Sequence, residues 1–308
     1  MRFEVTTLGT GAALPARGRY PSAQLLNVHE RLFLIDCGEG TQERLRMAQV
    51  NMGRIARVMI SHLHGDHYLG LMGLISSMHL QGRTAPLDVH GPADLRQVID
   101  LQLRVSGTFL RFPLKFHPLE HRSGALVFQD DRVEVAELAL KHRIDSTGFL
   151  FREAGLPRKL IKEKVELIPH YARQAVKMGQ DLVLPGGGVV PNEQLTAPPP
   201  KQRSYAYCSD TAFLPELVPF LHGVDLLYHE ATFAAALADR AKETMHSTAG
   251  QAATIAREAG AGQLLLGHFS SRYKDVQVLY NEAAAIFPNT LMACEGCTFQ
   301  VGPVHHAD

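Results

Sequence analysis

The segment SHLHGDHYLG, Ser61 to Gly70, constrains the fold most strongly, because it places three histidines and an aspartate within six positions. The three histidines repel one another when they are protonated, and all four residues pack poorly when buried without partners. A strand-like run, RIARVMIS, precedes them, and an apolar run typical of a buried helix, HYLGLMGLISSMHL, follows. The folded chain must therefore bring something to this loop that offsets the cost of the cluster.

The composition is that of a globular protein with a sizeable core: the 308 residues are 45% hydrophobic and 20% charged. A formal net charge of zero argues against a protein that coats nucleic acid through bulk positive charge, although it allows a local basic patch. No apolar run reaches the length of a membrane span, so we expect no membrane partner. Four cysteines are too few for a disulfide framework, which favours a reducing, cytoplasmic setting.

Strand-like and helix-like segments alternate in both halves of the chain. Residues 2–9, 23–28 and 31–36 are predicted strands, and residues 41–49 are a predicted helix with Thr41 as a plausible N-cap. The second half repeats this mixture from residue 204 onward. The layout predicts an α/β fold with two sheets and helices outside, in a single domain that spans residues 1–308.

Residues 151–202 differ from the rest of the chain. Residues 151–180 contain seven lysines and arginines against three acids, and the segments LPGGGVV and TAPPPKQR follow. We expect a projecting insertion, called the arm here, within the single domain. Its positive charge suits phosphate binding, and a merely solvated hairpin is the alternative interpretation.

The histidine-rich loop favours a metal site, because neutral imidazole is the commonest metal ligand and aspartate supplies a hard oxygen. Three more candidate ligands follow predicted strands: His142, Asp210 and His268. With a shared carboxylate and a bridging water, these residues and the loop could hold two ions. Two ions about 3.5–4 Å apart suit phosphoryl hydrolysis, because they stabilise both the attacking and the leaving oxygen.

The loop resembles the His-x-His-x-Asp-His signature of the metallo-β-lactamase superfamily, whose hydrolases fold as an αββα sandwich. Other stretches resemble motifs of its ribonuclease Z family, the tRNA 3′-processing endoribonucleases, and they occur in the family's order. These stretches are LGTGAALPARGRYPSAQLL, LIDCGEGTQ, HEAT (residues 229–232), HST (residues 246–248) and GHFSSRY.

The resemblance implies a metallo-β-lactamase αββα sandwich with an inserted arm and two zinc ions per subunit. One zinc would be bound by His62, His64 and His142, the other by Asp66, His67 and His268, with Asp210 between them. Asp66 would also accept a proton from the attacking water, and Glu230 and His246 would manage the proton of the leaving group. The expected substrate-binding residues are Arg17, Arg19, Ser270 and Arg272.

The resemblance also implies a function. The enzyme would remove the 3′ trailer from precursor tRNA, leaving a 3′-hydroxyl on the tRNA and a 5′-phosphate on the trailer. It would act as a cytoplasmic homodimer in which each arm serves the partner's active site. Two alternatives stay open: a phosphodiesterase of the same superfamily that acts on small substrates, and a non-enzymatic RNA-binding or scaffold protein.

Cys294 and Cys297 have the Cys-x-x-Cys spacing of some zinc and redox motifs. A zinc ribbon needs a second pair, and a thioredoxin-type motif needs a following helix, whereas TFQVGP looks extended. We therefore expect free, buried or partly buried thiols. His305 and His306 are expected to lie in a disordered tail.

Overall fold

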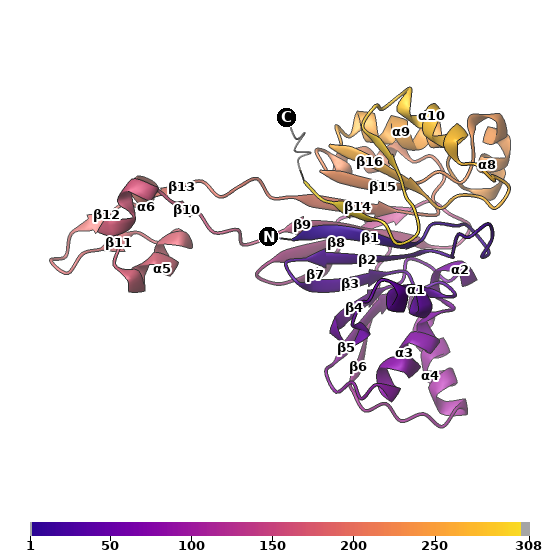
Figure 1. Cartoon of the computed structure of the whole chain (residues 1–308), viewed down its shortest axis with the longest axis horizontal. Coiled ribbons are helices and arrows are strands. Elements are labelled where there is room, and N and C mark those ends of the chain that lie inside the picture. Colours follow the sequence, from indigo (N-terminus) through magenta and orange to yellow (C-terminus); the bar gives the residue numbers. More distant parts are fainter. Residues whose placement is uncertain (1, 303–308) are drawn as a thin grey trace.

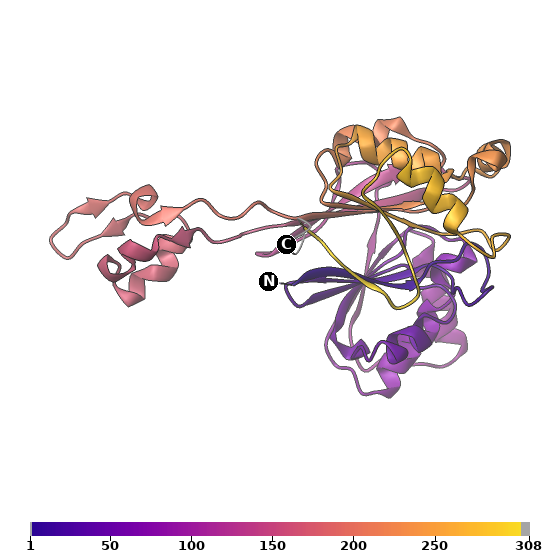
Figure 2. The same cartoon turned by 45° about the horizontal axis from the view of Figure 1, so that its top comes forward.

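The structure is a computed structural model, and it describes residues 2–302. Two sheets face each other, and helices cover both outer faces (Figure 1, Figure 2). The expected α/β αββα sandwich is therefore confirmed. His305 and His306 lie outside the described residues. Every helix among residues 2–302 is too short or too polar to cross a bilayer.

The first sheet has seven strands in the order β18-β1-β2-β3-β4-β5-β6. Its first part is antiparallel, and β3 to β6 run parallel. The strands are β1 (Phe3–Gly9), β2 (Ala23–Val28), β3 (Arg31–Ile35), β4 (Ile55–Met59), β5 (Leu87–Gly91), β6 (Leu114–Pro118) and β18 (Thr298–Gln300).

The second sheet also has seven strands, in the order β17-β16-β15-β14-β9-β8-β7. Strands β14 to β17 run parallel, and β7 to β9 form an antiparallel meander that joins them at β14. The strands are β7 (Leu126–Gln129), β8 (Val133–Leu140), β9 (Ser146–Glu153), β14 (Ser204–Cys208), β15 (Leu226–Glu230), β16 (Gln263–Gly267) and β17 (Thr290–Met292).

Helices pack on the outer face of each sheet (Figure 1). On the first sheet they are α1 (Thr41–Met47), α2 (Gly65–Tyr68), α3 (Leu71–Leu80) and α4 (Leu95–Val105), with the 3-10 turn η1 (Met52–Arg54). On the second they are α7 (Val218–Leu221), α8 (Ala238–Thr244), α9 (Ala249–Glu258) and α10 (Gln277–Ala284), with the 3-10 turns η4 (Pro215–Leu217) and η5 (Ala235–Leu237).

Side chains alternate along the strands and so supply three cores. On β14, Tyr205 and Tyr207 enter the core between the sheets, whereas Ala206 and Cys208 face the helices of the second sheet. This two-residue period is the direct consequence of the pleat.

Helix α1 starts at Thr41 with Gly40 as its N-cap, so the predicted cap is one residue too late. Gly40 has a φ of 83°, and the Thr41 hydroxyl donates to the Gly38 carbonyl (2.7 Å).

The arm leaves the sandwich between β9 and β14 and projects far from it (Figure 1, Figure 2). Gly155 allows this exit, because its φ is +59° and a Cβ there would lie 2.3 Å from the Asp131 carbonyl oxygen. The arm's elements are β10 (Lys159–Leu160), η2 (Lys162–Leu167), η3 (His170–Ala172), α5 (Arg173–Lys177), β11 (Leu182–Val183), β12 (Val189–Val190), α6 (Asn192–Leu195) and β13 (Thr196–Ala197). They enclose a small core of their own, formed by Ile168, Val176, Leu182 and Leu195.

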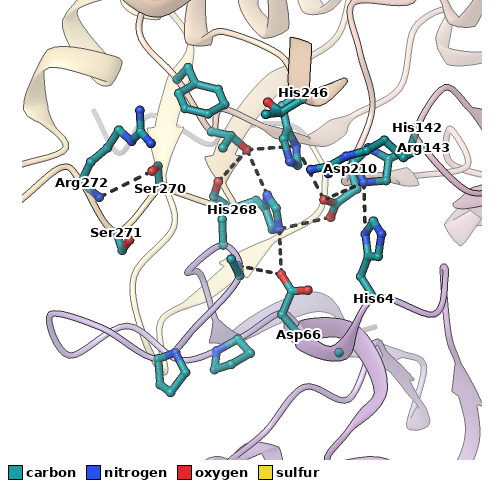
Figure 3. A pocket seen from close by; sticks show the side chains of 18 of the residues that line it. His64, Asp66, His142, Arg143, Asp210, His246, His268, Ser270, Ser271 and Arg272 are labelled. Atoms are coloured by element: carbon teal, nitrogen blue, oxygen red, sulfur yellow. Dashed lines mark hydrogen bonds and ion pairs between the residues drawn. The ribbon is translucent and has the colours of Figure 1, made fainter. Parts of the chain in front are cut away.

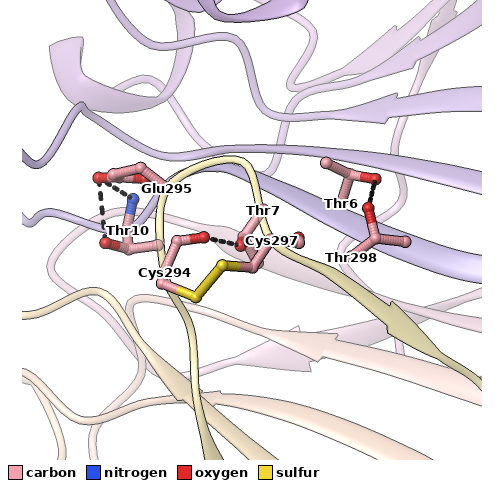
Figure 4. Close-up of a disulfide and its surroundings, with 7 residues drawn as sticks. All are labelled: Thr6, Thr7, Thr10, Cys294, Glu295, Cys297 and Thr298. Atoms are coloured by element: carbon pink, nitrogen blue, oxygen red, sulfur yellow. Dashed lines mark hydrogen bonds between the residues drawn. A yellow bond between two sulfur atoms is a disulfide. The ribbon is translucent and has the colours of Figure 1, made fainter.

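Cys294 and Cys297 form a disulfide, so the expectation of free thiols there is wrong (Figure 4). A turn brings them together: the Cys297 amide donates to the Cys294 carbonyl (3.0 Å), and Gly296 has a φ of +78°. The resulting Cα separation of 5.4 Å is within the range of disulfides. Cys37 and Cys208 are free and buried.

Candidate active site

The predicted ligands come from one edge of the sandwich. The carboxyl ends of the parallel strands of both sheets meet there, and β8 ends at the same edge because it runs antiparallel to β9, which is itself antiparallel to β14. His62 and His64 follow β4, His142 follows β8, Asp210 follows β14 and His268 follows β16. The topology thus gathers residues that are up to 206 positions apart, from His62 to His268, into one place.

Three residues turn into this edge through the left-handed backbone region. Asp36, Asp210 and His268 have φ values of 56°, 55° and 56° and lie one or two positions after a strand. For residues other than glycine, this conformation costs of the order of 1–3 kcal/mol and persists only where the surroundings impose it. Its repetition at three strand ends is typical of a functional site.

His62, His64 and His142 form the first ligand group. His64 Nδ1 lies 3.0 Å from His62 Nε2 and 3.2 Å from His142 Nε2. Burial lowers the pKa of each of these three histidines, which favours the neutral imidazole that binds metal.

Asp66, His67 and His268 form the second group. Asp66 Oδ2 lies 3.5 Å from His67 Nε2 and 3.6 Å from His268 Nε2. Asp210 lies between the two groups: its Oδ2 is 2.7 Å from His67 Nε2 and 3.1 Å from His268 Nε2, whereas its Oδ1 is 3.8 Å from His142 Nε2. The two carboxylate oxygens of Asp210 therefore face different ligand groups (Figure 3).

These residues fit two metal ions. His67 Nε2 and His268 Nε2 are buried and make no hydrogen bond, although carboxylate oxygens lie close by. Ligand atoms bound tetrahedrally to zinc at about 2.0–2.1 Å lie about 3.4 Å apart, close to the separations within both groups. All seven residues predicted as ligands are thus brought together, and their assignment as ligands stays a prediction.

The remaining ring nitrogens are held by a surrounding set of partners. His67 Nδ1 donates to Asp36 Oδ2 (2.6 Å), and His142 Nδ1 donates to the Met245 carbonyl (2.9 Å). His268 Nδ1 lies 3.0 Å from the Thr232 hydroxyl. Such contacts fix the tautomer and orientation of each ring, so that its other nitrogen faces the metal position.

Asp36 was missed as a site residue, although it lies in the LIDCGEGTQ segment. It is fully buried and accepts hydrogen bonds from the Ser61 amide (2.8 Å), the Ser61 hydroxyl (3.0 Å) and the Tyr207 hydroxyl (2.6 Å), besides that from His67. The backbone joins the same two loops, because the Cys37 amide donates to the His67 carbonyl (2.7 Å). Asp36 therefore couples β3 and the opposite sheet to the histidine loop.

Glu230 and His246 pair at the other side of Asp210. His246 Nδ1 lies 2.9 Å from Glu230 Oε1, which also accepts from the Thr211 amide (2.7 Å). Burial opposes the charge on His246, but attraction and hydrogen bonding by Glu230 outweigh it and raise the pKa of His246 to about 9. A protonated imidazole held in this way can donate a proton.

The pair is fixed by the start of α9. Thr248 caps this helix, and its hydroxyl and the Gln251 side chain form a reciprocal capping box. The adjacent Ser247 amide donates to Glu230 Oε2 (3.1 Å). The HST segment is thus the N-terminus of a helix that orients a glutamate, which in turn orients His246.

The two candidate ligand groups open into a pocket of about 530 Å3. Ser270 and Arg272 line it, and their role in binding substrate stays a prediction. Arg143 and Arg240 line it too, which the sequence did not suggest. Both side chains are exposed: Arg143 lies in the loop that follows β8, and Arg240 lies in α8.

Arg17 and Arg19 are engaged by the protein itself. Arg17 Nε donates to the Ser271 carbonyl (2.5 Å), and an Arg19 Nη donates to the Tyr273 carbonyl (2.6 Å). They therefore hold the segment that carries Ser270 and Arg272, and their contact with substrate phosphate stays a prediction. The same N-terminal loop reaches the ligand group, because the Ala13 amide donates to Asp66 Oδ2 (2.7 Å).

Comparisons with known proteins agree with this geometry. The chain is 47% identical to "Ribonuclease Z" of Bacteroides fragilis over 296 residues, which cover 96% of this chain and 97% of that protein. It is 45% identical to "Ribonuclease Z" of Cytophaga hutchinsonii over 311 residues, covering 100% and 99%. A family model described as "Anti-Pycsar protein Apyc1" matches residues 3–106.

Solved structures match over nearly the whole chain. Human tRNase Z, short form, has a TM-score of 0.70 and 30% identity, covering 97% of this chain and 99% of that one. The metallo-β-lactamase fold protein YhfI from Bacillus subtilis has the same TM-score of 0.70 at 20% identity, covering 97% of this chain and 100% of that one. The second likeness bears on the fold alone.

Proposed function

The chain belongs to the ribonuclease Z family and is a metal-dependent hydrolase of RNA phosphodiester bonds, and from this premise we propose that it is the zinc-dependent endoribonuclease that removes the 3′ trailer from precursor tRNA. The products would be a 3′-hydroxyl on the tRNA and a 5′-phosphate on the trailer. The observation that carries the proposal is the pair of ligand groups around Asp210, with Glu230 and His246 beside them.

Two zinc ions suit a site in which imidazole nitrogens outnumber carboxylates. His62, His64 and His142 would hold one ion, Asp66, His67 and His268 the other, and Asp210 would serve both. Bound zinc lowers the pKa of water and offsets negative charge on a phosphoryl group. Asp66 would accept the proton of the attacking water, since the Ala13 amide orients its carboxylate.

The departing 3′ oxygen needs a proton, and His246 would supply it. Glu230 is buried and ionised, and it holds the imidazole in its protonated form through the 2.9 Å contact. Donation by a positioned imidazole accelerates such steps by about 10²–10⁴-fold. Arg17, Arg19, Ser270 and Arg272 would bind or frame the substrate phosphates.

The arm, residues 151–202, would bind the body of the tRNA. Arg152 and Glu153 lie in β9 of the sandwich, so the arm itself carries six lysines and arginines between residues 154 and 180, against two acids. This excess supplies the charge that phosphate binding requires. The arm leaves the sandwich at the end opposite the N-terminal loop and α8, which border the pocket (Figure 1). An arm so placed is better suited to serve the pocket of a second subunit than its own.

A homodimer would meet this requirement. Four large apolar side chains on α3, on α4 and in the loop after α4 are exposed. They are Leu80 (81% exposed), Leu101 (51%), Val105 (68%) and Phe109 (88%). We propose that these side chains lie in the contact between the two subunits. A cytoplasmic location is proposed with it, as the place where the enzyme would meet precursor tRNA.

The test is turnover of a precursor tRNA with the cut site and both new ends mapped. A single cut after the acceptor stem, with a 3′-hydroxyl and a 5′-phosphate, would support the proposal. Hydrolysis of small phosphodiesters without cleavage of precursor tRNA would favour the small-substrate phosphodiesterase. Binding of tRNA by a protein with no bound metal and no turnover would favour the scaffold.

A further inference from the structure

Arg143 occupies a fixed position at the rim of the pocket. It follows the predicted ligand His142 directly, and the loop is held from two sides. The Lys141 amide donates to the Thr211 hydroxyl (3.2 Å), and the Lys141 carbonyl accepts from the Ala212 amide (2.8 Å). The His142 ring is itself bound to the Met245 carbonyl. The backbone that carries Arg143 is therefore preorganised, while its side chain is exposed.

Arg143 is also the least engaged of the arginines that line the pocket. Arg240 forms an ion pair with Glu243 (2.6 Å), and the Arg272 guanidinium lies 5.3 Å from the centre of the Phe233 ring. Arg143 makes no hydrogen bond and no ion pair with any residue of the described part of the chain. Its guanidinium is thus available to an anion that enters the pocket.

The proposed chemistry determines which end of the pocket holds the tRNA and which end holds the trailer. The oxygen that departs belongs to the last ribose of the tRNA, and His246 would protonate it, so that ribose must lie beside His246. Arg143 lies on this side, next to His142 and Asp210, whereas Ser270, Ser271 and Arg272 lie on the other side of His268 (Figure 3). The trailer must then run toward Ser270 and Arg272.

We propose that Arg143 binds the backbone phosphate on the tRNA side of the cleaved bond, and that Arg272 binds a phosphate of the trailer. This inference rests on the proposed function and deepens it. A guanidinium suits the task, since it can donate two parallel hydrogen bonds to one phosphate. The contact would hold the last nucleotide of the tRNA with its 3′ oxygen at His246.

Three charge-neutralising variants test the assignment: Arg143→Gln, Arg272→Gln and Arg257→Gln. Arg257 lies exposed in the last turn of α9, outside the pocket, and controls for the change in net charge. The substrates are a precursor tRNA with a trailer of about ten nucleotides, the same tRNA with a single trailer nucleotide, and a small nitrophenyl phosphodiester.

Arg143→Gln should lower kcat/KM by about 10- to 100-fold on both precursor tRNAs, the range for one lost charge-assisted hydrogen bond. Its loss on the small diester should be at least about tenfold smaller, and the salt dependence of tRNA cleavage should flatten by about one unit of slope. Arg272→Gln should lose more on the long trailer than on the single nucleotide. Arg257→Gln should behave as the unchanged protein, and Arg143→Lys should recover part of the loss.

Equal losses for Arg143→Gln on all three substrates would overturn the proposal, since Arg143 would then act at the reacting phosphate. A loss in kcat/KM for Arg143→Gln that depends on trailer length would mean that Arg143 binds the trailer and not the tRNA. No loss on either precursor tRNA would mean that Arg143 does not contact the substrate. These outcomes concern Arg143 alone. If the unchanged protein does not cleave precursor tRNA at all, it is the proposed function that fails.

Discussion

Replacing Asp36 by asparagine should weaken one metal position while leaving the fold intact. Asparagine keeps the shape of the side chain and tolerates the φ of 56° found there. What changes is the pattern of donors and acceptors, because four donors point at the carboxylate. The Ser61 amide faces Oδ1, and His67 Nδ1, the Tyr207 hydroxyl and the Ser61 hydroxyl face Oδ2.

Neither orientation of the amide can satisfy this arrangement. With its oxygen at the Oδ2 position, the NH2 group opposes the Ser61 N–H, and a buried donor is left unpaired at about 1–3 kcal/mol. With its NH2 group at the Oδ2 position, both hydroxyls can rotate to accept, but His67 must accept at Nδ1. Its proton then moves to Nε2, the nitrogen that faces Asp210, and that nitrogen can no longer bind metal.

The expected result is a loss of about 10- to 100-fold in affinity at the position that includes His67, or about 1.4–2.7 kcal/mol. Competition with a chromophoric zinc chelator measures this affinity. The affinity of the other zinc position should stay near its original value. Asp225→Asn is the matched control, because Asp225 is also buried and accepts from Ser204 and Lys201 away from the pocket. Unchanged zinc affinity at both positions in Asp36→Asn would refute the reasoning, as would an equal loss in Asp225→Asn.

Four other outcomes test the site and the arm. Asp210→Ala should lower zinc content at both positions, because its two oxygens face different ligand groups, and full content after dialysis would contradict the shared role. Burial opposes the charge on His246, but Glu230 outweighs burial and raises the pKa of His246 to about 9. Because His246 loses its proton above this pH, kcat on precursor tRNA should fall above about pH 9. His246→Ala should keep its zinc, lack this alkaline limb and lose about 10²–10⁴-fold in rate, and an unaltered pH profile would assign the donor elsewhere. Replacing residues 156–201 by a short turn should lower kcat/KM on precursor tRNA far more than on a small phosphodiester, whereas equal losses would mean that the arm is structural.

The sequence predicted the sandwich and the place of the ligands because strand ends are readable from local patterns. His142, Asp210 and His268 each follow an apolar run, and parallel strands bring such positions to one edge. The histidine loop supplied the reference to which these weaker signals could be joined. What spacing could not predict is which ring nitrogen faces the centre, as with His64 Nδ1 against His62 Nε2.

Other features depend on contacts that no local pattern encodes. Asp36 contacts His67, which is 31 positions away in sequence, and Tyr207, which is 171 positions away. Its role is therefore a property of the assembled sheets. Arg17 and Arg19 carry charge as expected, but the fold directs them to carbonyls of residues 271 and 273. The disulfide depends on a turn at Gly296, inside the CEGC segment, which no pattern in the sequence indicated. The segment that follows is extended as expected, since Thr298–Gln300 form β18.

The connection between the arm and the sandwich gives the arm a defined reach. Pro198, Pro199 and Pro200 form the returning half of this connection and are exposed. Consecutive prolines favour a stiff, extended spacer of about 3.1 Å per residue rather than a flexible tether. In the proposed homodimer, a precursor tRNA held both by one subunit's stiffly mounted arm and by the other subunit's pocket would need a helical stem that matches the span between them. The connection would then set the length of stem that the enzyme cleaves, because a stem shortened by a few base pairs could reach either contact but not both. Exchanging the three prolines for glycines would make the connection flexible and would allow cleavage of RNAs with shorter stems.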